Sequence, residues 1–153
     1  IAFLGHASNH YPEFFERYRG YVKALQASGL EPDPGLQVDA VTSEQSGMEA
    51  VAELAARGQS YDAIFAASDL IAIGAMKALH ERGLRVPTDV AIAGFDDIPM
   101  AGFVNPSLST VQQDTKLAGQ VLVESLLQLI NGEAVESRTL PVKLALRRSS
   151  GAS

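Results

Sequence analysis

The 153-residue chain contains no cysteine and no long uninterrupted run of hydrophobic residues. The lack of cysteine excludes a disulfide scaffold, a thiolate zinc site and a cysteine nucleophile. No apolar stretch approaches the ~18–20 residues that a membrane-spanning helix needs, so we expect no contact with a membrane. The first residues, Ile1–Gly5, look like a buried strand and lack the basic start of a secretion signal. We therefore expect a piece of a longer protein.

Basic residues are fewer than acidic ones, with 12 Lys and Arg against 18 Asp and Glu and a net charge of −6. A surface of this sign repels phosphate backbones, so the composition predicts no DNA contact by these residues. The 46% of hydrophobic residues are enough to form a core, and the length is that of one ordinary domain. A disordered chain is excluded because only 20% of the residues are charged.

Apolar clusters alternate with segments of helical periodicity. The predicted strands are Ile1–Leu4, Leu36–Val41, Ala63–Ala67, Val90–Gly94, Leu108–Gln112 and Thr139–Leu146. The predicted helices begin at Glu13, at Ser46 (a capping box with Glu49), at Ser68-Asp69 and at Asp114 or Thr115, and end before Gly29, Gly58, Gly83 and Asn131. Arg147–Ser153 is predicted to be a polar tail. Strands separated by helices pair in parallel through right-handed crossovers, which predicts an α/β fold with a doubly wound, mostly parallel sheet.

Ligands of such sheets bind beyond the carboxyl ends of the strands. The polar residues at these ends are His6, Ser8, Asn9, Thr42, Ser43, Glu44, Ser68, Asp69, Asp96 and Asp97. This set suits hydrogen bonding to a small polar ligand, although Asp69 is equally well explained as a helix cap. The chain has no nucleophile elbow, P-loop or dinucleotide motif, and we predict no catalysis, no cofactor and no metal site. Asp96-Asp97 with His6 or His10 is the one weak metal alternative.

Five segments resemble the lactose-repressor (LacI/GalR) family of transcription regulators: residues 16–21, 62–76, 86–97, 106–114 and 140–149. The resemblance implies a type I periplasmic-binding-protein-like fold, in which a small molecule binds between two lobes and a separate headpiece binds operator DNA as a dimer. The chain matches from the first strand of the C-terminal lobe onward, without the headpiece. Residues 1–110 and 138–148 would form one lobe of this fold, and the helix at 114–131 would belong to the other lobe.

That helix would therefore lose its usual partner in this chain. Its apolar face includes Leu117, Val121, Leu126 and Ile130. Each large side chain that is buried contributes roughly 1.5–3 kcal/mol. We therefore expect the helix to repack on the lobe or to exchange onto a neighbouring chain.

The resemblance also implies site residues. Arg17 matches the arginine that reaches the effector, although spacing alone favours an ordinary surface charge. Ser68 matches a polar contact, Asp96 matches an aspartate that accepts from ligand hydroxyls or ring nitrogens, and Gln113 is a weaker candidate. Thr42 stands where some members carry an aromatic that stacks on the ligand, which weighs against a hexose-type effector. The first loop, with His6, Asn9 or Tyr11, is the region that could compensate.

The same resemblance places a homodimer interface on Leu70, Ile73, Met76 and Val104, residues that could instead simply pack on the sheet. We thus expect the effector-binding and dimerisation part of a cytoplasmic LacI-family regulator, which contacts operator DNA only through the missing headpiece. A periplasmic sugar-binding protein of an ABC transport system is the alternative. A flavodoxin- or receiver-like protein that uses Asp96 as an acidic site is a third possibility.

Overall fold

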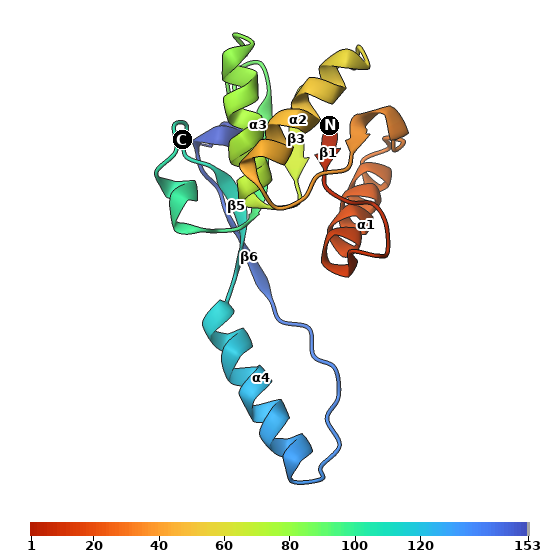
Figure 1. Ribbon diagram of the computed structural model, residues 1–153, viewed down its shortest axis with the longest axis vertical. Coiled ribbons are helices and arrows are strands. Elements are labelled where there is room, and N and C mark those ends of the chain that lie inside the picture. The colour runs from red at the N-terminus through yellow and green to blue at the C-terminus, as the bar shows by residue number, and fades with distance from the viewer. Residues whose placement is uncertain (153) are drawn as a thin grey trace.

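The computed structural model describes residues 1–152 as a six-stranded sheet with helices on both faces (Figure 1). The strands are β1 (Ala2–Leu4), β2 (Gln37–Val38), β3 (Ala63–Ala66), β4 (Ala91–Asp96), β5 (Ser109–Gln113) and β6 (Val142–Ala145), and the helices are α1 (Pro12–Ala27), α2 (Glu44–Ala56), α3 (Asp69–Glu81) and α4 (Thr115–Ile130). The sheet order is β2-β1-β3-β4-β5-β6, and every pairing is parallel except that of β6 with β5. This confirms the predicted α/β class and the mostly parallel sheet.

Neighbouring residues of β4 show which helices cover which face of the sheet. The ring of Phe95 lies 3.9 Å from the guanidinium carbon of Arg17, which comes from α1. Gly94 points the other way, and a Cβ built there would collide with Asp69 of α3. Because successive residues of a strand face opposite sides, α1 covers one face while α2 and α3 cover the other.

Helices α2 and α3 approach each other so closely that one position in each helix accepts only glycine. A Cβ at Gly74 would collide with the backbone carbonyl of Glu44, and a Cβ at Gly47 would collide with that of Ile71. Backbone atoms at such a crossing cannot swing aside as a flexible side chain can. These two glycines therefore fix the separation of the two helices.

Side-chain caps are found at two of the predicted helix starts, those of α3 and α4. The Ser68 hydroxyl accepts from the backbone N–H of Ile71 at 3.4 Å, and the Asp114 carboxylate accepts from that of Leu117 at 2.9 Å. The predicted capping box at Ser46 is wrong, because Ser43 caps α2. The Ser46 hydroxyl instead accepts from the N–H of Val41, which holds the loop that leads into α2.

The second strand and the C-terminal segment differ from the predictions. The second strand, predicted over Leu36–Val41, covers only Gln37–Val38. At its start Pro34–Leu36 form a 3-10 helix, with Asp33 accepting from the N–H of Gly35 at 2.7 Å. The segment after Leu146 is no free tail, since Arg148–Ser150 form a 3-10 helix in which Ser149 is fully buried. Ser153 lies outside the described residues.

The Ser149 hydroxyl explains why this segment is held. It donates to the carbonyl of Ile92 at 2.6 Å and accepts from the N–H of Ser109 at 2.8 Å. This buried hydroxyl has both a donor and an acceptor partner, and its two hydrogen bonds link the C-terminal segment to β4 and β5. The C-terminal segment is thus part of the folded body.

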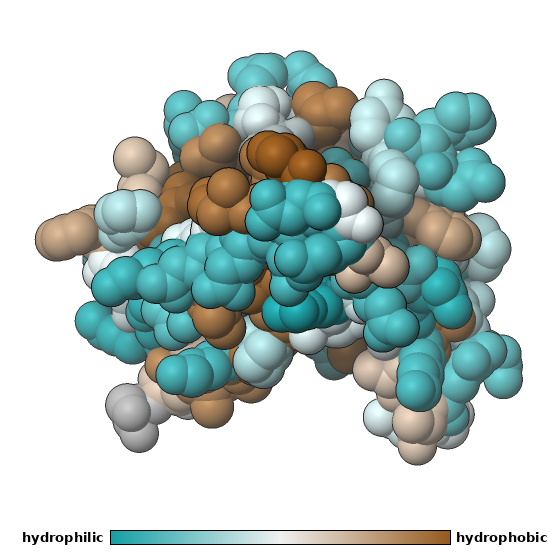
Figure 2. Space-filling model, turned by 90° about the horizontal axis from the view of Figure 1, so that it is seen from below, coloured by the Kyte–Doolittle hydropathy of each residue, from teal (hydrophilic) through white to brown (hydrophobic). Residues whose placement is uncertain are grey.

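By contrast, residues 114–141 project from the body as an arm, the term used below for this segment (Figure 1). No residue of α4 is buried, and Leu122 and Ile130 are 69% and 70% exposed. Seen from the α4 end, hydrophobic side chains gather over this part of the molecule (Figure 2). The expected repacking of α4 on the lobe is wrong, because β5 and β6 run past the edge of the body and carry the helix away from it. Exchange onto a neighbouring chain stays a prediction.

Within residues 1–152, no helix has the length and apolar character needed to cross a membrane.

Candidate functional site

The candidate site lies where β1, β3 and β4 reach their carboxyl ends, and Arg17 is at its centre. The Arg17 guanidinium donates to the carbonyl of Ala67 and lies between the rings of Phe14 and Phe95, 5.5 Å and 3.9 Å from their centroids. Its Nη2 is 3.6 Å from Oδ1 of Asp96. With 14% of its side chain exposed, Arg17 is not the ordinary surface charge that spacing alone favoured.

Asp96 faces Arg17 from a strained backbone. Its φ is +121°, a region that side-chain-bearing residues rarely adopt and that is often found at binding sites. The Gln113 amide donates to Asp96 Oδ1 at 2.9 Å, so the weaker candidate from the sequence joins the two stronger ones. One carboxylate oxygen therefore faces both a cation and an amide.

Burial shifts the pKa of both members of this pair. It raises the pKa of the Asp96 carboxyl, an effect that the nearby Arg17 charge opposes. It lowers the pKa of the Arg17 guanidinium, an effect that the Asp96 charge opposes. Both shifts come from taking charges out of water, which strengthens their interaction with a polar ligand.

Asp69 has a structural position that neither sequence interpretation foresaw. Ser68, not Asp69, caps α3, and the Asp69 carboxylate accepts from the N–H of Ile98 at 2.9 Å and from the Thr110 hydroxyl at 2.6 Å. This fully buried carboxylate ties α3 to the loop after β4. Both Asp69 carboxylate oxygens are thus committed to partners within the fold.

Ser68 and Asp97 are also engaged by the protein. The Ser68 side chain is buried and its hydroxyl caps α3, so its role toward a ligand stays a prediction. The Asp97 carboxylate accepts from Arg147 at 2.6 Å and from Gln112 at 2.7 Å. These partners occupy the carboxylate that the weak metal alternative needed, and residues 1–152 hold no group of three or more potential metal ligands.

The first loop adds an aromatic stack to the site. The rings of His6 and Tyr11 are parallel within 8°, with centroids 3.9 Å apart, and His6 Nδ1 is 3.5 Å from a carboxylate oxygen of Asp39. His6 Nε2 is buried and has no hydrogen-bond partner within residues 1–152. Asn9 is exposed on the same loop, and Thr42 is exposed after β2.

The aromatic residues around Arg17 were missed by the sequence argument. Neither Phe14 nor Phe95 was among the predicted site residues, although the place of Phe95 directly before Asp96 at a strand end was an available signal. A groove of about 810 Å³ opens beside them between α1 and the residues leading into β6, lined in part by Tyr21, Phe65 and Leu140.

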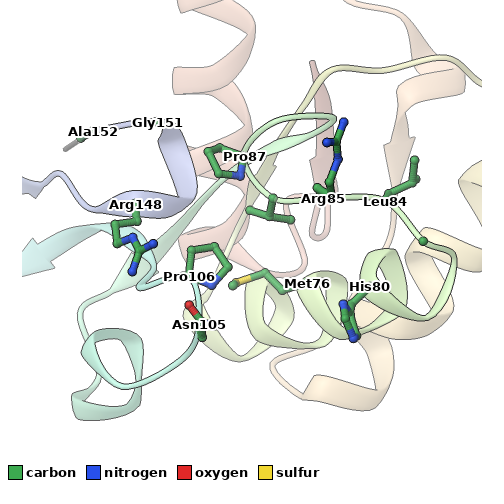
Figure 3. Close-up of a pocket in the computed structure, with 12 residues that line it drawn as sticks. Met76, His80, Leu84, Arg85, Pro87, Asn105, Pro106, Arg148, Gly151 and Ala152 are labelled. Atoms are coloured by element: carbon green, nitrogen blue, oxygen red, sulfur yellow. The ribbon is translucent and has the colours of Figure 1, made fainter.

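The predicted dimer residues lie on a different side of the body. Leu70, Ile73 and Val104 are half-buried, whereas Met76 is only 8% exposed and faces a hollow that Pro106 and Arg148 also line (Figure 3). Ile73 and Val104 also pack against the core. These four side chains alone offer little free apolar area.

Two residues near Val104 expose much more apolar surface. Phe103 is 89% exposed and Met100 is 50% exposed, both in the loop between β4 and β5. Exposed apolar side chains that gather in one patch mark candidate interaction surfaces. The signal in the sequence was an apolar pair inside a loop that also contains Pro99 and Gly102.

The family follows from a comparison with known domains. A model described as "Periplasmic binding protein-like domain" matches residues 1–150. The chain belongs to this family. The resemblance to lactose-repressor-type regulators is confirmed by the regulator CelR of Thermobifida fusca, which is 40% identical over 131 residues, 86% of this chain and 37% of that relative.

Solved structures of transcription regulators agree. A CelR–cellobiose complex is 36% identical over 97% of this chain and 46% of that chain, with a TM-score of 0.91. The lac repressor dimer bound to operator and the anti-inducer ONPF is 33% identical over 99% of this chain and 52% of that chain, also with a TM-score of 0.91. These proteins are regulators, which favours the regulator over the transport and flavodoxin-like alternatives. The chain spans about half their length or less.

Proposed function

We propose that this chain is the effector-binding and dimerisation part of a LacI-family transcription regulator that acts in the cytoplasm. The observation on which this rests is the Arg17–Asp96–Gln113 cluster at the carboxyl edge of the sheet, in a chain whose relatives are regulators. An arginine fork, a carboxylate and an amide suit a ligand rich in hydroxyl or ring nitrogen groups. In this proposal the site binds the metabolite and does not transform it.

The signal to DNA would come from the relative position of two lobes. A ligand that contacts this edge and the facing lobe favours one lobe arrangement over another, and the free energy of that preference changes operator affinity. In the proposed regulator α4 is part of the facing lobe, because its exposed leucines need a partner that the body does not supply. Operator contact itself is assigned to a headpiece outside this chain.

The effector site is tested by calorimetry of the intact protein against pentoses, hexoses, disaccharides, nucleosides and amino acids. We expect one class to bind, and we expect Arg17→Ala and Asp96→Ala each to weaken it about tenfold or more, since each removes a charge-assisted hydrogen bond. Lys23→Ala, which removes an exposed charge from the same helix, is the matched control. Unchanged affinity in both site variants would contradict the assignment.

The regulator itself is tested by the gene upstream of Ile1 together with operator binding. A helix-turn-helix segment is expected there, whereas a secretion signal would support the transport alternative. Operator affinity of the intact protein should change when the effector found by calorimetry is added. An affinity that does not respond to the bound effector would contradict the proposed regulation.

For the dimer, we propose that Leu70, Ile73, Met76 and Val104 lie in the interface with Phe103 as its most exposed member. An aromatic anchor at a two-fold interface often dominates the binding energy. Light scattering should report monomers for Phe103→Asp and for Ile73→Asp, while Phe15→Asp on the distant α1 should leave the dimer intact. A dimer that persists in both interface variants would refute this surface.

A further inference from the structure

We infer that Asp97 and Arg147 are positioning residues that hold the Asp96 carboxylate toward the candidate site. The inference rests on the proposed function and adds to it a link between that site and the strands that lead to the arm. Two side chains, Gln112 and Arg147, donate to the Asp97 carboxylate. These three side chains are called the brace below.

The Asp96 side chain lies on the side of the sheet that strand alternation does not predict for it. Successive residues of β4 face opposite sides, so Asp96 should share the side of Gly94, which faces Asp69 of α3. Its carboxylate instead lies 3.6 Å from Arg17, which comes from α1. The φ of +121° accounts for this turn, and a backbone in that region persists only where the surrounding structure holds it.

Two consecutive glutamines of β5 hold the two aspartates from opposite sides of the sheet. Gln113 lines the groove beside α1 and donates to Asp96 at 2.9 Å. Gln112 faces the α3 side, as Thr110 does, and donates to Asp97 at 2.7 Å. The carboxylates of adjacent residues are thus separated onto two sides, which requires the turned backbone at Asp96.

Asp97 is the fixed member of this aspartate pair. Arg147 donates to one of its carboxylate oxygens at 2.6 Å and Gln112 donates to the other, so only 11% of the Asp97 side chain is exposed. Its backbone N–H donates to the Thr110 hydroxyl at 3.3 Å, and its φ of +55° is one that aspartate tolerates. Hydrogen bonds to an ionised carboxylate are strong, so Asp97 fixes the chain direct after Asp96.

Arg147 is in turn attached to the start of β5. Its Nη1 donates to the carbonyl of Leu108 at 2.8 Å, and its backbone N–H donates to the Ser109 hydroxyl at 2.7 Å. Arg147 follows β6 and Gln112 belongs to β5, and these two strands lead to the arm (Figure 1). The brace therefore joins both connecting strands to the backbone that orients Asp96.

The first test is crystallographic and needs no ligand. Crystals of the intact protein with Arg147→Ala or Gln112→Glu should show Asp96 with a negative φ and without its hydrogen bond to Gln113. Gln112→Glu places a second carboxylate against Asp97 at an exposed position, so it breaks the brace without opening the core. An Asp96 that keeps both its positive φ and its Gln113 hydrogen bond in these variants overturns the inference.

The second test is calorimetry of the intact protein with D-ribose, D-glucose, maltose, adenosine and L-glutamine as probes. A probe that binds the wild type should bind Arg147→Ala about tenfold more weakly. Arg147→Lys should fall between the two, because it restores the charge without the second donor. Arg148→Ala, which removes the exposed neighbouring charge, is the matched control and should bind as the wild type does.

A double-mutant comparison separates positioning from a general structural role. In an Asp96→Ala background, Arg147→Ala should weaken binding by less than about twofold, because it acts through Asp96. Equal weakening in both backgrounds would overturn the inference, as would an Arg147→Ala protein that binds as tightly as the wild type.

Failure of the proposed function gives a different pattern. Arg17→Ala and Asp96→Ala would then leave the binding of every probe unchanged. The crystal structures of the two brace variants would still decide whether the brace orients Asp96. If instead these two site variants lose binding while the brace variants keep it, the proposed function stands and the brace is refuted.

Discussion

The body of the molecule and its arm have similar local sequence signals and very different surroundings. Both contain a well-capped helix with an apolar face: α3 begins at the Ser68 cap and α4 at the Asp114 cap. In α3 most residues are buried, including Ile71 and Leu79, whereas α4 buries none. Caps and periodicity thus determine where a helix forms, and tertiary partners determine whether its apolar face stabilises the fold.

The largest contrast should come from truncating one leucine in each region. Leu79→Ala leaves a cavity in a fully buried position and should lower the free energy of unfolding by about 3–5 kcal/mol. Leu126→Ala removes an exposed side chain and should change it by less than about 0.5 kcal/mol. Urea unfolding of the 153-residue chain followed by circular dichroism measures both. Equal losses would mean that the arm has a partner in this chain.

A smaller contrast should follow from adding one methyl group to a glycine. Gly74→Ala brings a Cβ into the carbonyl of Glu44 and should cost about 2–3 kcal/mol. Gly119→Ala meets nothing within 4 Å and should be neutral or stabilising by up to about 1 kcal/mol, because alanine favours helix. Thermal melting of the two variants compares them directly. A Gly74→Ala protein as stable as the parent would refute the close crossing of α2 and α3.

Two aspartates next to helix starts give the next contrast. Asp69→Ala leaves the Ile98 N–H and the Thr110 hydroxyl without their acceptor and should cost about 2 kcal/mol. Asp114→Ala removes only an exposed helix cap and should cost about 1 kcal/mol or less. The urea concentrations at the midpoints of unfolding rank the two losses of stability. A larger loss for Asp114→Ala would mean that the arm contributes more to stability than its exposure indicates.

The smallest effect concerns pH. Because burial raises the Asp96 pKa, this carboxyl takes up its proton at higher pH than an exposed aspartate, and effector affinity should fall as pH drops through that raised value. The folded chain then binds the proton more tightly than the unfolded chain, so the contribution of Asp96 to stability should rise over the same pH window. Calorimetry between pH 7 and pH 4 tests this, and Asp96→Asn should bind weakly with a flatter profile. Identical profiles for both proteins would exclude Asp96 as the titrating group.

Much of the fold could be predicted from the sequence because it depends on local signals. Glycines after α1, α2 and α3, the caps at Ser68 and Asp114 and the apolar strands appear where they were expected. The cap of α2 was misplaced because Ser43 and Ser46 both lie at plausible positions and only the loop geometry separates them. The buried Ser149 could not be foreseen, since its partners Ile92 and Ser109 are far away in sequence.

Part of the candidate site could also be predicted from the sequence. Arg17, Asp96 and Gln113 came from the resemblance, and the structure brings them together. The role of Asp69 depends on which residues face it across the fold, and periodicity contains no information of that kind. Phe103 was missed because an apolar residue in a loop has no periodic pattern that marks it as exposed.

The most direct test of the account is effector-dependent release or capture of operator DNA by the intact protein and by its Arg17→Ala variant. The wild-type protein should change its operator affinity when the effector found by calorimetry is added, and the variant should bind operator normally but require at least about tenfold more effector. Fluorescence anisotropy of a labelled operator measures both quantities. A variant that responds at the same effector concentration as the wild type would contradict the assignment of this edge of the sheet as the effector site.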